Sequence, residues 1–490
     1  MNTVQRIAKN TGVLVISQMV SRIFSFFYVM YTARYLGAEG FGILSLALAF
    51  TGIFGVFTDL GLGSLTVREV VRDKSLVGKY LNNITVIKII LVTFTFGLIA
   101  LAVNVLGYPE QTTKVVYLIA LSVIFSAFTI MFYSIFQAFE KMEYQSLGQI
   151  LESILMFSGI MLAIKYNFTI IGFASLYLIA SIIVLGYSFV VLRWRFFNPI
   201  FVGSPRKIEI DWRFWKSTIK AALPFGLSGI FITIYYHMDT VMLSLMIPNA
   251  NEIVGWYNAA YKIIFVLMSI PQIYVIVIFP IMSRFFKTSE KSLKFIFNRS
   301  IRYIVLISIP IVAGITLLSD RIILLVFGSD YVPSIIVLQI LVWSFFFAAI
   351  GGVFGYLLNS INRQATLSKI VGCGMVLNLI LNALLIPNYS YIGASIATDL
   401  TRFFVIFTEF IILAKIGFNL GNKRFLGGIL KIIISSLIMI VFIKYLRDTN
   451  LLLLIISSAL LYFTTLYLLK GLDKDDISLL RRLFDLENGS

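Results

Sequence analysis

Long apolar runs separated by short polar segments dominate this chain of 490 residues. A helix that crosses a bilayer needs roughly 20 mostly apolar residues. The runs reach that length and lack the ten-residue alternation that is typical of outer-membrane strands. We therefore predict an all-α polytopic membrane protein with about 14 transmembrane helices, at residues 11–33, 41–62, 84–106, 115–138, 146–165, 169–192, 217–247, 253–282, 301–319, 333–358, 367–386, 390–414, 425–445 and 451–470.

The second half of the chain repeats parts of the first half in the same order. The matched stretches are 37–44 with 251–257, 137–141 with 359–363, and 167–174 with 388–395. Such recurrence in a very apolar chain is typical of transporters built from duplicated helical bundles. An even number of six spans per bundle makes both bundles enter the membrane from the same face, so we predict two parallel-related six-helix bundles and two additional C-terminal helices.

The longest polar stretch lies between the sixth and seventh predicted spans and is the natural boundary between the bundles. The predicted domains are an N-terminal six-helix bundle at 1–195, a cytoplasmic linker at 196–216, a C-terminal six-helix bundle at 217–415, two additional transmembrane helices at 416–470 and a cytoplasmic tail at 471–490.

Composition and charge support this class. The chain is 59% hydrophobic and only 13% charged, which excludes an ordinary soluble domain. The net charge is +17, but 30 of the 40 Lys and Arg fall in segments on the side of the N-terminus. This asymmetry follows the positive-inside rule and predicts a cytoplasmic membrane protein with both termini in the cytoplasm. Nucleic acid is therefore not implied. The bases expected on the outer side are Arg34, Lys114, Lys165, Arg321, Lys444 and Arg447.

Few residues are available for catalysis. The chain has one Cys and one His, Cys373 and His237, and no nucleotide-binding, metalloprotease or hydrolase motif. We expect no catalytic residue, no metal site and no organic cofactor. A membrane-bound glycosyltransferase or ligase needs a sizeable extramembrane domain or a clustered acid and metal site, and no predicted loop is large enough to supply one.

Several stretches resemble one transporter family. The first half has Arg22, the stretch 33–42 (ARYLGAEGFG) and Asp59-Leu60-Gly61 followed by Arg68-Glu69, and the second half has the stretch 255–262 (GWYNAAYK). These are similar to the polysaccharide-exporter branch of the multidrug/oligosaccharidyl-lipid/polysaccharide superfamily, and to its O-antigen-type flippases. The resemblance covers essentially the whole chain. It implies a V-shaped pair of bundles that moves an undecaprenyl- or dolichyl-linked glycan headgroup from the inner to the outer leaflet.

Ionisable side chains inside the predicted spans are the main site candidates, because each needs a partner or a wet cavity. Arg22, Lys262 and Arg402 are expected to receive the phosphate or pyrophosphate of a lipid carrier, Arg in a bidentate manner and Lys as a point charge. Asp399 precedes Arg402 by three residues, so it can neutralise that base instead. Lys88 is close enough to the inner interface to snorkel.

The acids and tyrosines have alternative roles. Asp239 is expected to bind a coupling cation, Na⁺ or H⁺, or a sugar hydroxyl, or to be the counter-charge of a membrane base. Tyr235 and Tyr236 are candidates for stacking on sugar rings, although tyrosines also form the interfacial belt of membrane proteins. Asp59 and Arg68 are expected to fix a cytoplasmic gate or a helix end.

The functional hypothesis is a flippase that translocates a lipid-linked glycan by alternating access. The expected partners are the glycan substrate, membrane lipids and glycan-assembly enzymes, and the expected state is a monomer. The alternative is a cation-coupled multidrug exporter of the same superfamily. Such an exporter favours an acid-dominated cavity for cationic drugs, whereas Arg22, Lys262 and Arg402 are basic.

Overall fold

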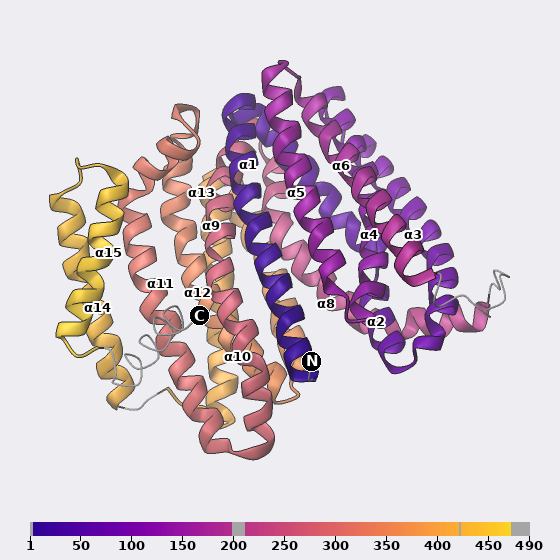
Figure 1. The fold of residues 1–490 in the computed structure, drawn as a ribbon. Helices are drawn as coiled ribbons and strands as arrows, with labels where there is room; N and C mark the ends of the chain where they lie inside the picture. Colours follow the sequence, from indigo (N-terminus) through magenta and orange to yellow (C-terminus); the bar gives the residue numbers. More distant parts are fainter. Residues whose placement is uncertain (1–2, 198–210, 421–422, 472–490) are drawn as a thin grey trace. The chain divides into compact units, whose positions relative to one another are not determined.

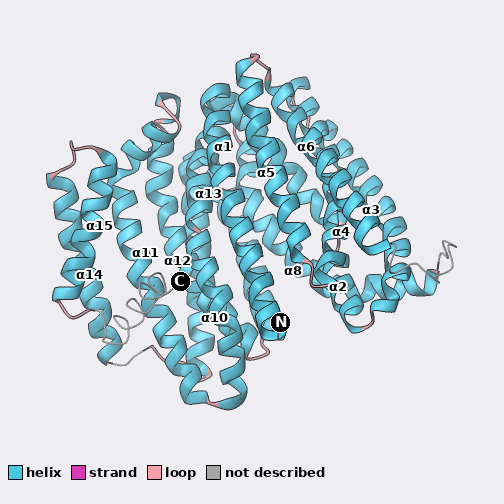
Figure 2. Ribbon diagram, in the orientation of Figure 1, coloured by secondary structure: helices cyan, strands magenta, loops and turns pink. Residues whose placement is uncertain are grey.

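The computed structural model describes residues 3–197, 211–420 and 423–471, and these residues form helices joined by turns, without a strand (Figures 1 and 2). Most of the predicted linker 196–216 and nearly all of the predicted tail 471–490 lie outside the described residues. The early helices are α1 (Thr3–Gly55), η1 (Val56–Thr58), α2 (Leu62–Arg72), η2 (Lys74–Leu76), α3 (Val77–Val105), α4 (Glu110–Ala138), α5 (Met142–Lys165), α6 (Ile170–Val191) and the π-helix η3 (Leu192–Phe197). The later helices are α8 (Trp212–Met246), α9 (Asn251–Leu267), α10 (Ser269–Thr288), α11 (Glu290–Val326), η4 (Ser329–Tyr331), α12 (Ser334–Ser360), α13 (Gln364–Lys415), α14 (Lys423–Tyr445) and α15 (Leu451–Leu468).

The predicted number of membrane spans is confirmed. Within the described residues, 12 helices are long and apolar enough to cross a membrane. Two of them, α1 and α13, each cover two predicted spans and are interrupted by a kink, at Gly37 (φ 66°) and at Ser390 (φ 50°). The two kinks bring the total to the 14 spans that the apolar runs predict.

The sequence repeat is reproduced in the backbone. Glu140 after α4 and Asn362 after α12 both have the left-handed conformation, with φ 58° and 62°. In each turn the next amide closes a 6→1 bond, from Lys141 N to Phe136 O and from Arg363 N to Leu358 O, both at 2.8 Å. This is the helix-ending geometry of a Schellman motif. The matched stretches therefore form the same turn in both halves of the chain.

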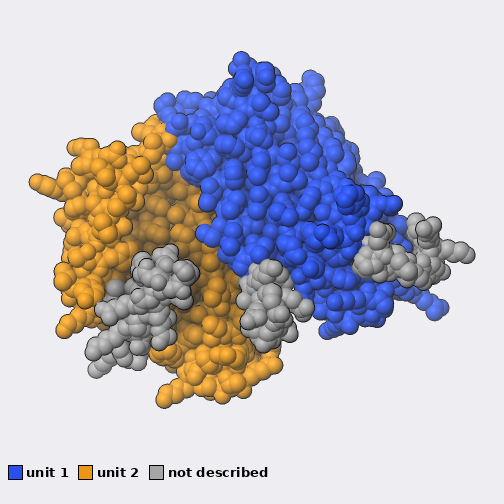
Figure 3. All heavy atoms as spheres, in the orientation of Figure 1, with its two compact units in different colours: residues 1–262, 326–331, 371–397 blue, residues 263–325, 332–370, 398–490 orange. Residues whose placement is uncertain are grey.

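The described chain divides into two compact units, drawn blue and orange in Figure 3. Unit 1 comprises residues 1–262, 326–331 and 371–397, and unit 2 comprises 263–325, 332–370 and 398–490. One core of unit 1 gathers Tyr80, Phe136, Phe196 and Trp215 from α3, α4, η3 and α8. Unit 2 has its own core around Phe297, Phe354 and Tyr462. The division into bundles at 1–195 and 217–415 stays a prediction.

Candidate functional site

A buried polar network surrounds Asp239 in unit 1. Asp239 is only 3% exposed, and its carboxylate accepts hydrogen bonds from Tyr257 Oη and from Asn382 Nδ2, each at 2.6 Å. The same Asn382 nitrogen donates to Asn378 Oδ1 at 3.1 Å. Helices α8, α9 and α13 thus each contribute a polar group to one membrane-buried cluster.

The amide of Asn382 is oriented by its role as donor, since a carboxylate can only accept. Its nitrogen therefore faces Asp239, and its oxygen has no hydrogen-bond partner among the described residues. Asn378 lies one helical turn earlier on α13, so both amides occupy the same helix face. Sequence reasoning missed these two residues. Their four-residue spacing within an apolar run is the signal that could have identified them.

Two candidate phosphate-binding bases also belong to unit 1. Arg22 is half-buried on α1, one residue after Ser21, whose hydroxyl donates to Gln149 O of α5 at 3.3 Å. Lys262 is partly buried on α9, and its charge acts on His237 of α8. His237 in turn packs on α1, because a Cβ at Gly52 would lie 3.1 Å from its Nε2. The structure therefore places Lys262 and His237 near each other.

The third candidate base lies in unit 2. Arg402 of α13 is nearly buried, and Asp399 lies one turn before it on the same helix and interacts with it electrostatically. This is the neighbour expected from the three-residue spacing. A phosphate-binding role for Arg402 stays a prediction.

The two candidate tyrosines are neighbours on α8. The ring centroids of Tyr235 and Tyr236 lie 5.9 Å apart at an interplanar angle of 72°, an edge-to-face pair. Tyr236 is 36% exposed, whereas Tyr235 is less accessible. One ring of the pair can therefore be contacted from outside the helix.

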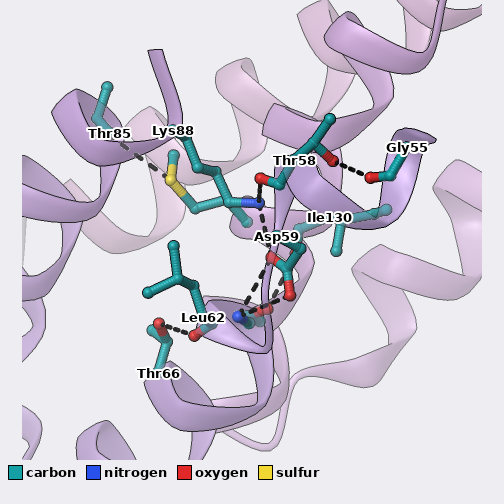
Figure 4. Close-up of polar contacts among 11 residues, drawn as sticks. Gly55, Thr58, Asp59, Leu62, Thr66, Thr85, Lys88 and Ile130 are labelled. Atoms are coloured by element: carbon teal, nitrogen blue, oxygen red, sulfur yellow. Dashed lines mark hydrogen bonds and ion pairs between the residues drawn. The ribbon is translucent and has the colours of Figure 1, made fainter. Parts of the chain in front are cut away.

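Asp59 has a partner that the sequence reading did not assign to it (Figure 4). Lys88 of α3 is fully buried, and its Nζ lies 2.7 Å from Asp59 Oδ1 and 3.4 Å from Thr58 O. The expectation that Lys88 snorkels to the interface is therefore wrong. Asp59 also accepts from the Gly63 backbone N–H at 3.2 Å, at the start of α2. Arg68, which we grouped with Asp59, forms an ion pair with Glu69 at 2.7 Å.

The repeat-related glycines Gly42 and Gly255 form a reciprocal helix crossing in unit 1. A Cβ at Gly42 would lie 2.7 Å from the carbonyl carbon of Asn251, and a Cβ at Gly255 would lie 2.9 Å from that of Ala38. Each glycine thus faces the backbone four residues before the other glycine. Only residues without a side chain allow α1 and α9 to approach so closely.

Three hydrogen bonds connect residues beside Gly42 and Gly255 to the segment 326–331 of unit 1. Tyr331 Oη donates to Ala33 O at 2.8 Å, Trp256 Nε1 donates to Asp330 O at 2.9 Å, and Arg34 Nε donates to Val326 O at 2.9 Å. The last helical turns before Gly37 and the short helix η4 are therefore joined to the glycine crossing. We call this region, Gly42 and Gly255 with these three hydrogen bonds, the glycine crossing.

The all-helical fold, its duplicated turns and its buried membrane charges define a multi-pass membrane transporter. The chain belongs to the Polysaccharide biosynthesis protein family, whose sequence pattern matches residues 7–286. This confirms the predicted membership of the polysaccharide-exporter branch of the superfamily.

Individual relatives agree with this placement. The chain is 24% identical over 397 residues to the probable low-salt glycan biosynthesis flippase Agl15 of Haloferax volcanii, an alignment that covers 81% of each protein. The lipid II flippase MurJ, in an inward closed conformation, has the same fold with a TM-score of 0.76, 19% identity and coverage of 92% of this chain and 97% of MurJ. An inward-facing MATE multidrug resistance transporter of the MOP superfamily follows with a TM-score of 0.66, 15% identity and coverage of 81% and 95%.

Proposed function

We propose that this protein is a flippase that translocates a polyprenyl-(pyro)phosphate-linked oligosaccharide across the cytoplasmic membrane, for synthesis of a cell-surface polysaccharide or glycoprotein. The observation that carries the proposal is the pair of bases, Arg22 and Lys262, on membrane-spanning helices of unit 1. A base within a membrane span is rare and typically marks a substrate or ion pathway, and the phosphate of a carrier lipid is an anion that such bases can bind. Membership of the polysaccharide family and similarity to a glycan flippase support the same substrate class.

Each residue has a distinct role in this proposal. Arg22 binds the carrier phosphate through its planar guanidinium, and Lys262 adds a point charge. Tyr235 and Tyr236 offer aromatic rings to the first sugars of the glycan. The polyprenyl tail stays in the lipid while the headgroup crosses. No bond is made or broken, so the protein acts as a transporter and not as an enzyme.

Asp239 is the proposed site of energy coupling. A hard cation such as Na⁺ prefers oxygen ligands. The carboxylate of Asp239 contacts the amide of Asn382, whose oxygen is buried without a hydrogen-bond partner among the described residues. Protonation of the same carboxylate is the other way to occupy the site. In either case the ion must bind one conformation more tightly than the other, because equal binding shifts no equilibrium.

The glycine crossing is the proposed outer gate. Both glycines lie near the predicted outer ends of the spans 41–62 and 253–282, and the backbones of α1 and α9 touch there. Release of a headgroup on that side requires these backbones to separate. In this proposal, the contact between the two backbones is the closed position of the gate.

The proposed orientation has both termini in the cytoplasm, and the protein is proposed to work as a monomer beside glycan-assembly enzymes. Cysteine-accessibility labelling in intact cells checks the orientation. The segment 193–216, which contains the predicted cytoplasmic linker, and both termini are expected to react only after the membrane is opened, and labelling from outside would contradict this topology.

Purified protein in lipid vesicles tests the function itself. A fluorescent polyprenyl-pyrophosphate-linked oligosaccharide is expected to move to the opposite leaflet, and a cationic dye is expected to stay where it is. The MATE-like fold makes a multidrug exporter the alternative. Transport of the dye without movement of the glycolipid would favour that alternative.

A further inference from the structure

The first turns of α8 carry an exposed surface that the transport proposal does not use. Trp212 is 73% exposed, and Arg213, Lys216 and Lys220 are exposed as well. The three bases recur at intervals of three and four residues, so they lie along one side of the helix. This surface, Trp212, Arg213, Lys216 and Lys220, is here called the α8 basic surface.

The backbone beneath this surface is firmly held. Asp211 caps α8 by accepting from Phe214 N at 3.0 Å, and its carboxylate forms an ion pair with Lys79 of α3 at 3.1 Å. Trp215 Nε1 donates to the buried Asn83 Oδ1 at 2.7 Å. The Phe214 amide and the Lys79 ammonium lower the pKa of Asp211, so this acid stays ionised and engaged. The α8 basic surface is therefore fixed in place before any ligand arrives.

A cavity of about 490 Å³ lies on this surface. Its lining residues are Trp212, Arg213, Trp215, Lys216 and Ile219, which combine three apolar side chains with two bases and include no acid. An apolar floor beside two cations suits a ligand with a hydrocarbon part and an anionic part.

Adjacent bases extend the positive charge. Arg193 and Arg195 are exposed on η3, which precedes α8 in the described chain, and Trp194 between them is 75% exposed. Phe196 of η3 and Trp215 of α8 belong to the same core of unit 1. Both segments thus present exposed tryptophan and arginine from one packed end of the unit.

We propose that the α8 basic surface is a binding site for an anionic membrane phospholipid, with its phosphodiester on Arg213 and Lys216 and an acyl chain along Trp212 and Ile219. Exposed Trp beside Lys and Arg is typical of the membrane interface, where cytoplasmic-leaflet anionic lipids attract basic residues. The apolar stripe continues along α8 through the exposed Leu223 toward the membrane span Gly229–Met246. A bound lipid is therefore continuous with the bilayer. This site is independent of the proposed transport substrate.

Quenching of tryptophan fluorescence by lipids with brominated acyl chains tests the proposal. The full-length protein in mixed detergent–lipid micelles is titrated with brominated phosphatidylglycerol or brominated phosphatidylcholine, and comparison with a Trp212→Phe variant isolates the signal of Trp212. Phosphatidylglycerol is expected to quench Trp212 at the lower concentration. Removal of Arg213 and Lys216 by Gln should weaken this preference by about fivefold for each charge, since one base near the surface contributes roughly 1 kcal/mol.

A variant with Lys287→Gln and Lys291→Gln, which loses two exposed bases of unit 2, is the matched control and should retain the preference. Equal quenching by both lipids, or an unchanged preference in the Arg213 and Lys216 variant, would overturn the proposal. Inorganic phosphate should not compete with phosphatidylglycerol at equal concentration. If a polyprenyl phosphate protects Trp212 and phosphatidylglycerol does not, the surface receives the carrier lipid and the phospholipid proposal fails.

Discussion

Replacement of Gly255 by Ala should open the proposed outer gate. The added methyl would overlap the carbonyl oxygen of Ala38 and lie 2.9 Å from its carbonyl carbon. The same change at Gly42 would overlap the carbonyl oxygen of Asn251, with the carbonyl carbon at 2.7 Å. Carbon atoms in contact normally lie about 3.5–4.0 Å apart, and the carbonyl oxygen is closer to the added methyl than the carbonyl carbon is. The helices α1 and α9 must therefore separate by more than about 1 Å. Overpacking of this kind costs about 1–3 kcal/mol.

That cost falls only on the conformation in which the two helices touch. A penalty of about 1–3 kcal/mol on one of two states changes their ratio by roughly 5- to 150-fold. We expect Gly255→Ala to populate the outward-open state. The separation can be measured by double electron–electron resonance between spin labels on Glu39→Cys and Glu252→Cys, which are both exposed positions. The native cysteine is removed by Cys373→Ser.

Gly97→Ala on α3 is the matched control, because a Cβ there meets no atom within 4 Å. It should leave the distance distribution unchanged. For Gly255→Ala, a new population at longer distance is expected. A lower melting temperature with the distances of the unaltered protein would show that the crossing is a static packing contact and would refute its role as a gate.

Three further changes test other parts of the account. Lys88→Met should destabilise the protein by about 1–3 kcal/mol, which is less than for a fully buried ion pair because Asp59 is partly exposed. Thermal unfolding in detergent should show that adding Asp59→Asn restores the melting temperature. An unaltered melting temperature in the single variant would contradict the pairing. Asn382→Ala removes the amide beside the proposed cation site, so translocation in vesicles should lose its response to an imposed Na⁺ or proton gradient, and an unchanged response would argue against coupling there. Gly393→Ala should lower the melting temperature more than Gly172→Ala, because the added methyl lies 2.7 Å from the rigid Leu385 carbonyl carbon in the first case and 2.8 Å from the Phe168 side chain in the second. Equal effects would contradict this reasoning.

Hydrophobic length and repetition could be read from the sequence because both are local properties. A span needs only enough apolar residues, and the turns at Glu140 and Asn362 depend on residues within one helical turn. The reciprocal contact of Gly42 with Gly255 is different. The sequence aligned the two glycines as repeats, but only the fold shows that they pack against each other's helix.

Partners of charged and polar groups could not be predicted in the same way. Asp59 and Lys88 are 29 residues apart, and their pairing depends on how α3 packs against the turn before α2. The contact of Asp239 with Asn382 spans 143 residues and depends on the packing of α8 and α13. Side-chain chemistry marked Asp239 as a candidate, whereas its neutral neighbours required the three-dimensional structure.

The role of Arg22 is the central claim, and glycolipid translocation in reconstituted vesicles tests it most directly. If Arg22 binds the carrier phosphate, Arg22→Ala should abolish translocation at near-normal abundance, and Arg22→Lys should restore part of it because the charge remains without the bidentate geometry. Adding Asp239→Asn to Arg22→Ala should not restore transport. Full recovery in that double variant would show that Arg22 only balances a buried carboxylate, and it would contradict the phosphate-binding role.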